Sequence, residues 1–143
     1  MNVHLIFHTK MATPMRRDDL KRIHDYMGGI IKGVGGNSIR IGGVENHVHI
    51  LAALPKTMAL SDFVRTIKAE SSRWIKSLDS YYRTFAWQEG YGAFSVSSSV
   101  VESTVAYIGN QAEQHRKVTF AEEYKRFLDA YNTEYDERYL ETD

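Results

Sequence analysis

Hydrophobic and polar residues alternate with period two in three stretches of the chain, which predicts β-strands at residues 3–8, 38–44 and 47–54. A turn-prone dipeptide separates the second stretch from the third, so we expect these two strands to pair as a hairpin. Two further short extended pieces fall within residues 85–96, around a pair of glycines. The pattern therefore predicts a small antiparallel sheet.

Elsewhere, apolar residues recur every three or four positions, which is the spacing of amphipathic helices. This spacing covers residues 20–34, 60–78, 100–115 and 120–131. The last stretch of the chain, residues 132–143, is polar and acidic, and we expect it to form a surface tail.

The order strand, helix, strand, strand, helix, strand is that of a ferredoxin-like split βαβ fold in the α+β class. We expect an antiparallel sheet with helices on one face, extended by the C-terminal helices, as a single domain over residues 1–143. The other face of the sheet is expected to be open and to display outward side chains of the central strands.

The composition is that of a soluble globular protein: 43% of the 143 residues are hydrophobic and 25% are charged. No apolar stretch approaches the length of a membrane span, and the N-terminus lacks the features of a signal peptide. The chain has no cysteine, which excludes disulfides and thiolate metal or redox sites. These features predict a cytoplasmic protein with no membrane partner.

The net charge of zero conceals two halves of opposite sign. Residues 1–83 contain 13 basic and 7 acidic residues, whereas residues 84–143 contain 5 basic and 11 acidic residues. A phosphate backbone responds to local charge, so the basic half indicates a nucleic-acid partner, although a solvated helix face explains the same charges equally well. The candidate DNA-binding cations are expected on the exposed side of the helix at 60–78 and are Arg65, Lys68, Arg73 and Lys76.

His47 and His49 stand one residue apart in a predicted strand, so both imidazoles project from one face of the sheet. Val48 and Ile50 then point to the opposite face. Two neutral imidazoles side by side are half of a divalent metal site. Taken alone, the dipeptide is explained more simply as two outward polar residues with nothing bound.

Tyr107 and Gln111 lie four residues apart on the helix expected at 100–115, so they share one helix face. Such a pair is ordinarily an exposed polar couple. However, a Gln carbonyl oxygen can bind a metal ion and a Tyr hydroxyl can act as a nucleophile. Beside two histidines, these groups would complete a centre that cleaves a phosphodiester.

The His47-Val48-His49 motif and the Tyr-x-x-x-Gln helix of Tyr107 and Gln111 resemble those of the single-tyrosine HUH transposases of bacterial insertion sequences, including the REP-associated tyrosine transposases. The resemblance extends over most of the chain, with further matching blocks at residues 4–10, 41–44, 68–75, 87–96 and 119–124. One departure is Asn46, where the family often has Asp.

The resemblance implies a reaction and the residues that carry it. His47, His49 and Gln111 would hold one Mg²⁺ or Mn²⁺ at a DNA phosphate. Tyr107 would attack that phosphate in single-stranded DNA bearing a hairpin near the element's end, and would leave a 5′-phosphotyrosine. Because the family works as a dimer, a homodimer is expected.

Other residues are candidates for supporting roles. Tyr91 is a candidate for stacking on a DNA base, and Asn46 and His115 are candidates for orienting the metal ligands. Residues expected in structural or core positions are His4, His8, Trp87 and Phe94.

Three other functions are open from the sequence. A rolling-circle initiator uses the same chemistry but is commonly a larger protein. A non-catalytic or domesticated nucleic-acid-binding module could use the same sheet, although residues 90–96 match the RNA-recognition signature only superficially. A metallohydrolase without a covalent step would leave Tyr107 unused.

Overall fold

The structure is a computed structural model that describes residues 1–11, 13–110 and 122. The strands are β1 (Asn2–His8), β2 (Asn37–Val44), β3 (His47–Ala53) and β4 (Gly92–Val96). The helices are α1 (Leu20–Gly33), α2 (Leu60–Lys76) and α3 (Val101–Gly109). Short 3₁₀ helices at Arg17–Asp19, Ser80–Tyr82 and Ser98–Val100 lie in the connecting segments.

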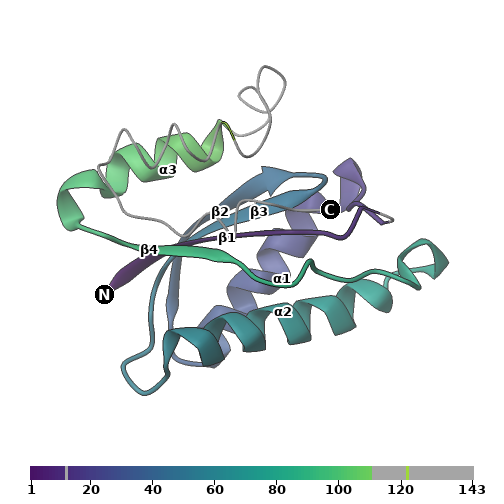
Figure 1. Ribbon diagram of the computed structural model, residues 1–143, viewed down its shortest axis with the longest axis horizontal. Helices are drawn as coiled ribbons and strands as arrows, with labels where there is room; N and C mark the ends of the chain where they lie inside the picture. The colour runs from purple at the N-terminus through teal and green to yellow at the C-terminus, as the bar shows by residue number, and fades with distance from the viewer. Residues whose placement is uncertain (12, 111–121, 123–143) are drawn as a thin grey trace.

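The four strands form one antiparallel sheet in the order β2-β3-β1-β4. The two strands that follow each other in the hairpin, β2 and β3, are neighbours, and β1 lies between β3 and β4. This order confirms the ferredoxin-like split βαβ plan predicted from the sequence. Helices α1 and α2 lie along one face of the sheet, and α3 crosses the opposite face (Figure 1).

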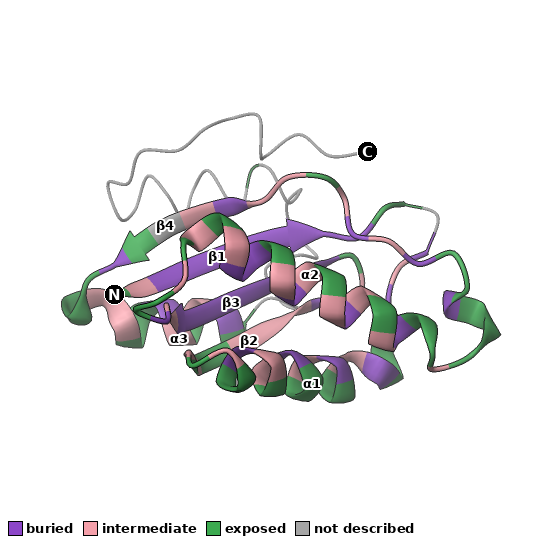
Figure 2. Cartoon of the chain, turned by 90° about the horizontal axis from the view of Figure 1, so that it is seen from below, coloured by how far each residue is buried: buried purple, intermediate pink, exposed green. Residues whose placement is uncertain are grey.

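The main core lies between the sheet and the pair α1 and α2. Period-two alternation sends one set of apolar side chains from the central strands β1 and β3 into this layer. Both strands are almost entirely buried (Figure 2), because their other face is covered as well. Each buried aliphatic side chain contributes about 1.5–3 kcal/mol to stability. The strand residues of this core are Val3, Leu5, Phe7, Val48, Ile50 and Ala52.

The predicted elements agree with the observed ones within about two residues at each end for β1, β2, β3, α1 and α2, whereas only one strand, β4, is observed where two short extended pieces were expected within residues 85–96. The helix expected at 100–115 is observed from Val101 to Gly109 in the part of the chain that the structure describes. The helix expected at 120–131 and the tail at 132–143 lie outside the described residues, apart from Glu122. Trp87 is buried in the core as predicted, whereas the side chain of Phe94 is outside the description.

One expectation about the sheet was wrong. The face opposite α1 and α2 was expected to be open, but α3 packs on it through a second, smaller core of Leu51, Val96 and Ile108. This matters for the site because the histidine pair of β3 lies on that face. Among the described residues, no helix combines the length and apolar character needed to cross a membrane.

Candidate functional site

Four histidines form a continuous row on the α3 side of the sheet. His4 and His8 come from β1, and His47 and His49 come from the adjacent strand β3. In the strand register, His8 is directly opposite His47, whereas His49 is opposite Ile6, one step diagonal from His4. Ring centroids are 5.4 Å apart for His8 and His47, 5.1 Å for His47 and His49, and 5.2 Å for His49 and His4.

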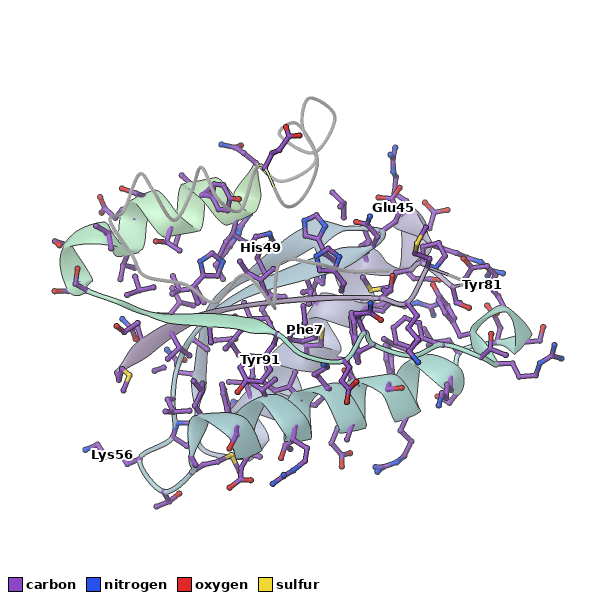
Figure 3. The ribbon with its side chains drawn as sticks, in the orientation of Figure 1. Phe7, Glu45, His49, Lys56, Tyr81 and Tyr91 are labelled. Carbon is purple, nitrogen blue, oxygen red and sulfur yellow. The ribbon has the colours of Figure 1, made fainter. Side chains whose placement is uncertain are left out.

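These histidines are buried rather than displayed to solvent. His4, His47 and His49 have no exposed surface and His8 is 7% exposed. Figure 3 shows His49 on the α3 side of the sheet, whereas Phe7 and Tyr91 lie on the α2 side. The alternation of the strand therefore placed the imidazoles on the predicted face, but α3 covers that face.

Each of the two HUH histidines has a hydrogen-bond partner at Nδ1. The Nδ1 atom of His47 lies 2.9 Å from Oδ1 of Asn46, and the Nδ1 atom of His49 lies 3.0 Å from Nε2 of His4. Because a carboxamide oxygen can only accept, His47 donates from Nδ1, and its lone pair is on Nε2. Burial lowers the pKa of His4 to about 3, so this imidazole is neutral at pH 7.

The hairpin turn holds Asn46 in this position. The main-chain carbonyl of Asn46 accepts a hydrogen bond of 3.0 Å from the amide of Thr9, which ties the turn to the end of β1. Gly43 precedes the turn with φ of +147°, and a Cβ there would lie 2.3 Å from the carbonyl oxygen of His47. Only glycine fits this position, which explains one of the two glycines before the histidine motif.

Tyr107 belongs to α3, and its ring packs against the histidine row from the α3 side of the sheet. Its ring is half-buried, and its centroid lies 5.5 Å from that of His49 and 6.4 Å from that of His4, in both cases edge to face. The predicted tyrosine and the predicted histidine pair are therefore brought together, although more than fifty residues separate them in the chain.

The position of Tyr107 depends on how α3 rests on the sheet. Ile108, the next residue, packs against Leu51 of β3 and Val96 of β4. Its main-chain carbonyl also lies over Gly42 of β2, where a Cβ would be only 2.8 Å away. At the end of the helix, Arg40 reaches Gly109 so closely that a Cβ on that glycine would meet the guanidinium at 2.9 Å. The positive charge of Arg40 near the C-terminus of α3 interacts favourably with the helix dipole.

The residues at this position suit a divalent ion. Two adjacent imidazoles are good ligands for a divalent metal, and the carbonyl oxygen of Gln111 is a suitable hard third ligand. Gln111 and the supporting candidate His115 lie outside the described residues, so the structure places only the two histidines. Within the described ranges, no cluster of three or more His, Asp or Glu residues could hold a metal, and a third ligand of another type is needed.

The candidate DNA-binding residues lie elsewhere. They belong to α2 and the segment before β4, on the opposite side of the sheet from Tyr107. Arg65 pairs with Asp62, and Arg73 pairs with Glu70 at 2.9 Å, while Lys76 is exposed. Tyr91 is half-buried against the main core.

Lys68 differs from the expectation of an exposed cation. Its ammonium group donates to the main-chain carbonyls of Gln88 and Gly90, at 2.7 and 2.8 Å, and lies over the ring of Phe7. Burial lowers its pKa from the ordinary value, and nearby Glu89 opposes that shift. Lys68 therefore fastens α2 to the segment that leads into β4.

The structure also adds residues that the pattern did not single out. A solvent-open hollow of about 500 Å³ runs from α1 to the end of α3, and it is lined by Lys21, His24 and Arg40 among others. An adjoining hollow of about 460 Å³ continues beside α1 to Lys32. No sequence signal marked Arg40; adjacent glycines within a strand, here Gly42 and Gly43, are a signal that could have indicated a close backbone approach, but no such approach was predicted.

Comparisons with known proteins agree with this arrangement. A protein from Deinococcus radiodurans R1 described as a "putative transposase" superposes with a TM-score of 0.60 at 22% identity, over 78% of this chain and 90% of that one. A REP-associated tyrosine transposase, solved bound to a REP hairpin, superposes with a TM-score of 0.62 at 13% identity, over 82% of this chain and 69% of that one. A search of curated proteins found no match.

At these identities, the two structures establish a shared fold. The family assignment comes from the sequence, because the model of the IS200-like transposases matches residues 1–111. This range includes both HUH histidines, the tyrosine and the glutamine. The chain therefore belongs to the IS200-like transposase family.

Proposed function

We propose that this protein cleaves and rejoins single-stranded DNA through a covalent bond between Tyr107 and a 5′-phosphate. The observation that carries the proposal is the position of the Tyr107 ring, 5.5 Å from the ring of His49 and over the row that also contains His47. The proposed nucleophile and the two proposed metal ligands thus lie close together although they come from different elements, and this proximity supports a phosphoryl-transfer reaction at the site.

In the cleavage step, the phenolic oxygen of Tyr107 forms a bond to phosphorus and the bond from phosphorus to the 3′ oxygen breaks. The tyrosine loses its proton and the departing 3′ oxygen gains one, so the step consumes no cofactor. Attack by another 3′-hydroxyl reverses the exchange and joins a new strand. The energy of the original phosphodiester is kept in the phosphotyrosine, which is why rejoining needs no ATP.

His47 and His49 would hold Mg²⁺ or Mn²⁺ with Gln111 as the third protein ligand. The ion supplies Lewis-acid polarisation of the scissile phosphate and offsets the charge of the transition state. The burial of both histidines excludes water around them, and a poorly hydrated site strengthens the interaction of a charged phosphate with its ligands. Asn46 orients His47 through the hydrogen bond at Nδ1.

We further propose that the substrate carries a hairpin and that the protein acts as a homodimer. The support for the hairpin is the structural neighbour that was solved with a REP hairpin, together with the family match. Arg65, Arg73, Lys76 and Tyr91 are retained as candidate DNA contacts, at a distance from the scissile phosphate.

The test is formation of a denaturant-resistant adduct. The protein is incubated with Mn²⁺ and labelled single-stranded DNA from the ends of its own element, and the products are separated on a denaturing gel. We expect an adduct with the wild type and with Tyr26→Phe, because Tyr26 stacks on Trp74 on the far side of the sheet. We expect none with Tyr107→Phe.

Other outcomes would assign the alternatives. An adduct that persists in Tyr107→Phe would refute the nucleophile. Nicking without any adduct would indicate a metallohydrolase, and tight binding without nicking would indicate a binding module.

A further inference from the structure

We infer that His4 is a positioning residue for the metal ligand His49: its Nε2 atom accepts a hydrogen bond from the Nδ1–H group of His49 and keeps the lone pair of His49 on Nε2. The inference rests on the proposed function, because it assumes that His49 binds the metal. It goes beyond that function by assigning a role to a histidine of β1 that lies outside the HUH motif.

The geometry of the pair is fixed by the sheet. The two nitrogen atoms are 3.0 Å apart, and both side chains have no exposed surface. They come from β1 and β3, which are neighbouring strands in the middle of the sheet. Neither backbone can shift without breaking the ladder between them, so the hydrogen bond holds the His49 ring at one orientation.

The direction of the bond decides whether His49 can bind a metal through Nε2. If His4 donated from Nε2, the accepting Nδ1 atom of His49 would carry the lone pair and the proton of His49 would be on Nε2. That proton would block coordination at Nε2. If His4 accepts, the proton of His49 is on Nδ1 and the lone pair is on Nε2.

The neighbouring ligand supports the second arrangement. His47 also has its Nδ1 atom engaged, and there the partner is Oδ1 of Asn46, which can only accept. With His4 as acceptor, His47 and His49 have the same tautomer, and in each ring the lone pair on Nε2 is the one that would bind the metal. A metal-binding histidine almost always donates its other ring nitrogen to a fixed acceptor.

The first experiment measures Mn²⁺ affinity from the EPR signal of the free ion. The variants are His4→Phe, which removes the acceptor, and His4→Gln, whose carboxamide can place an acceptor near the original Nε2. His24→Gln is the matched control, because His24 is a half-buried histidine of α1, outside the histidine row. We expect about 10- to 100-fold weaker binding in His4→Phe, and wild-type affinity in the control. His4→Gln should recover most of the loss.

Equal Mn²⁺ affinity in wild type and a folded His4→Phe variant would overturn the inference while leaving the proposed metal site intact. The proposed site itself is tested by His47→Ala and His49→Ala. If these bind Mn²⁺ as tightly as the wild type, the assignment of the ligands fails, and the inference about His4 fails with it.

The second experiment needs no variant at His4 and therefore does not depend on how that variant folds. Nitrogen-15 NMR of the histidine rings distinguishes the two neutral tautomers, and His49→Gln assigns the His49 signals. We expect the Nδ1–H tautomer of His49 in the metal-free protein at pH 7. A dominant Nε2–H tautomer would show that His4 donates instead, and would refute the inference.

Discussion

Ile108 packs so closely over Gly42 that a Cβ on this glycine would lie 2.8 Å from the carbonyl oxygen of Ile108 and 2.8 Å from its Cγ2 atom. Tyr107 precedes Ile108, so this contact sets the height of the tyrosine above the sheet. A helix carbonyl cannot yield to an inserted methyl group as a flexible side chain could. The absence of a side chain at Gly42 thus determines where Tyr107, the proposed nucleophile, lies.

Gly42→Ala tests this relationship. The added methyl group must push the end of α3 away from β2, and a misplacement of about 1 Å costs up to 100-fold in rate. We expect adduct formation to fall about 10- to 100-fold while the sheet stays folded, as measured by circular dichroism. Gly29→Ala is the control, since nothing lies within 4 Å of a Cβ there and alanine favours a helix. Unchanged adduct formation in Gly42→Ala would show that α3 is not seated by this contact.

Asn46→Ala tests the partner of the first HUH histidine. Loss of the Oδ1 acceptor frees His47 to rotate and to exchange tautomers, so Mn²⁺ affinity should fall about tenfold or more. Asn46→Asp keeps an oxygen acceptor, and a charged one, so we expect binding at least as tight as in the wild type. An alanine variant that binds Mn²⁺ like the wild type would exclude an orienting role for Asn46.

Lys68→Met tests whether this cation serves the fold. The substitution removes two charge-assisted hydrogen bonds to Gln88 and Gly90, and we expect a loss of about 1.5–3 kcal/mol in urea unfolding. Lys76→Met, at an exposed position of the same helix, should change stability by about 0.5 kcal/mol or less.

The same two variants separate stability from DNA binding. If Lys76 contacts a phosphate, its removal lowers the slope of DNA affinity against salt concentration by about one unit, and Lys68→Met leaves that slope unchanged. A reduced slope in Lys68→Met would mean that its ammonium group also reaches DNA.

His24→Gln tests a pH dependence of stability. Burial lowers the pKa of His24 to about 4, Asp25 opposes this shift, and Arg40 adds to it. Between about pH 4 and 6.5 the unfolded chain therefore binds a proton at this residue that the folded protein does not, and stability rises with pH across this window. Removing the imidazole should lower the slope by up to about 1.4 kcal/mol per pH unit. Identical slopes in urea titrations of the two proteins between pH 4.5 and 6 would contradict the shift.

The strands and their two faces could be predicted because alternate positions of β1 and β3 are apolar throughout, although Ile6 and Leu51 make the histidine face partly apolar as well. The sequence could not predict that the histidine row is buried, since this depends on where α3 lies. Contacts of Ile108 with Gly42 and Leu51 determine the position of α3, and Ile108 is more than fifty positions away from each of them in the sequence. Lys68 was misjudged for a similar reason: helical periodicity placed it outward, but irregular backbone at Gln88 and Gly90 supplied acceptors within its reach.

His4 shows the same limit for the site. Its strand was predicted correctly, but a polar residue on a strand gives no sign of which residue of the neighbouring strand it contacts. The pairing of β1 with β3, and the register that sets His4 diagonal to His49, had to come from the structure. Until the strand order is known, a buried histidine of β1 and a histidine of the HUH motif are unrelated positions.

The two-residue turn between β2 and β3, Glu45 and Asn46, has a consequence for sequence change in this protein. Deleting or inserting a single residue there would slide β3 by one position against β2 and invert every side chain on it. Val48 and Ile50 would then face α3, and both imidazoles would enter the hydrophobic core between the sheet and the helices α1 and α2. The length of this turn is therefore as important for placing the two imidazoles as the histidines themselves. We expect natural changes in loop length to occur in other loops of this protein before they occur in this turn.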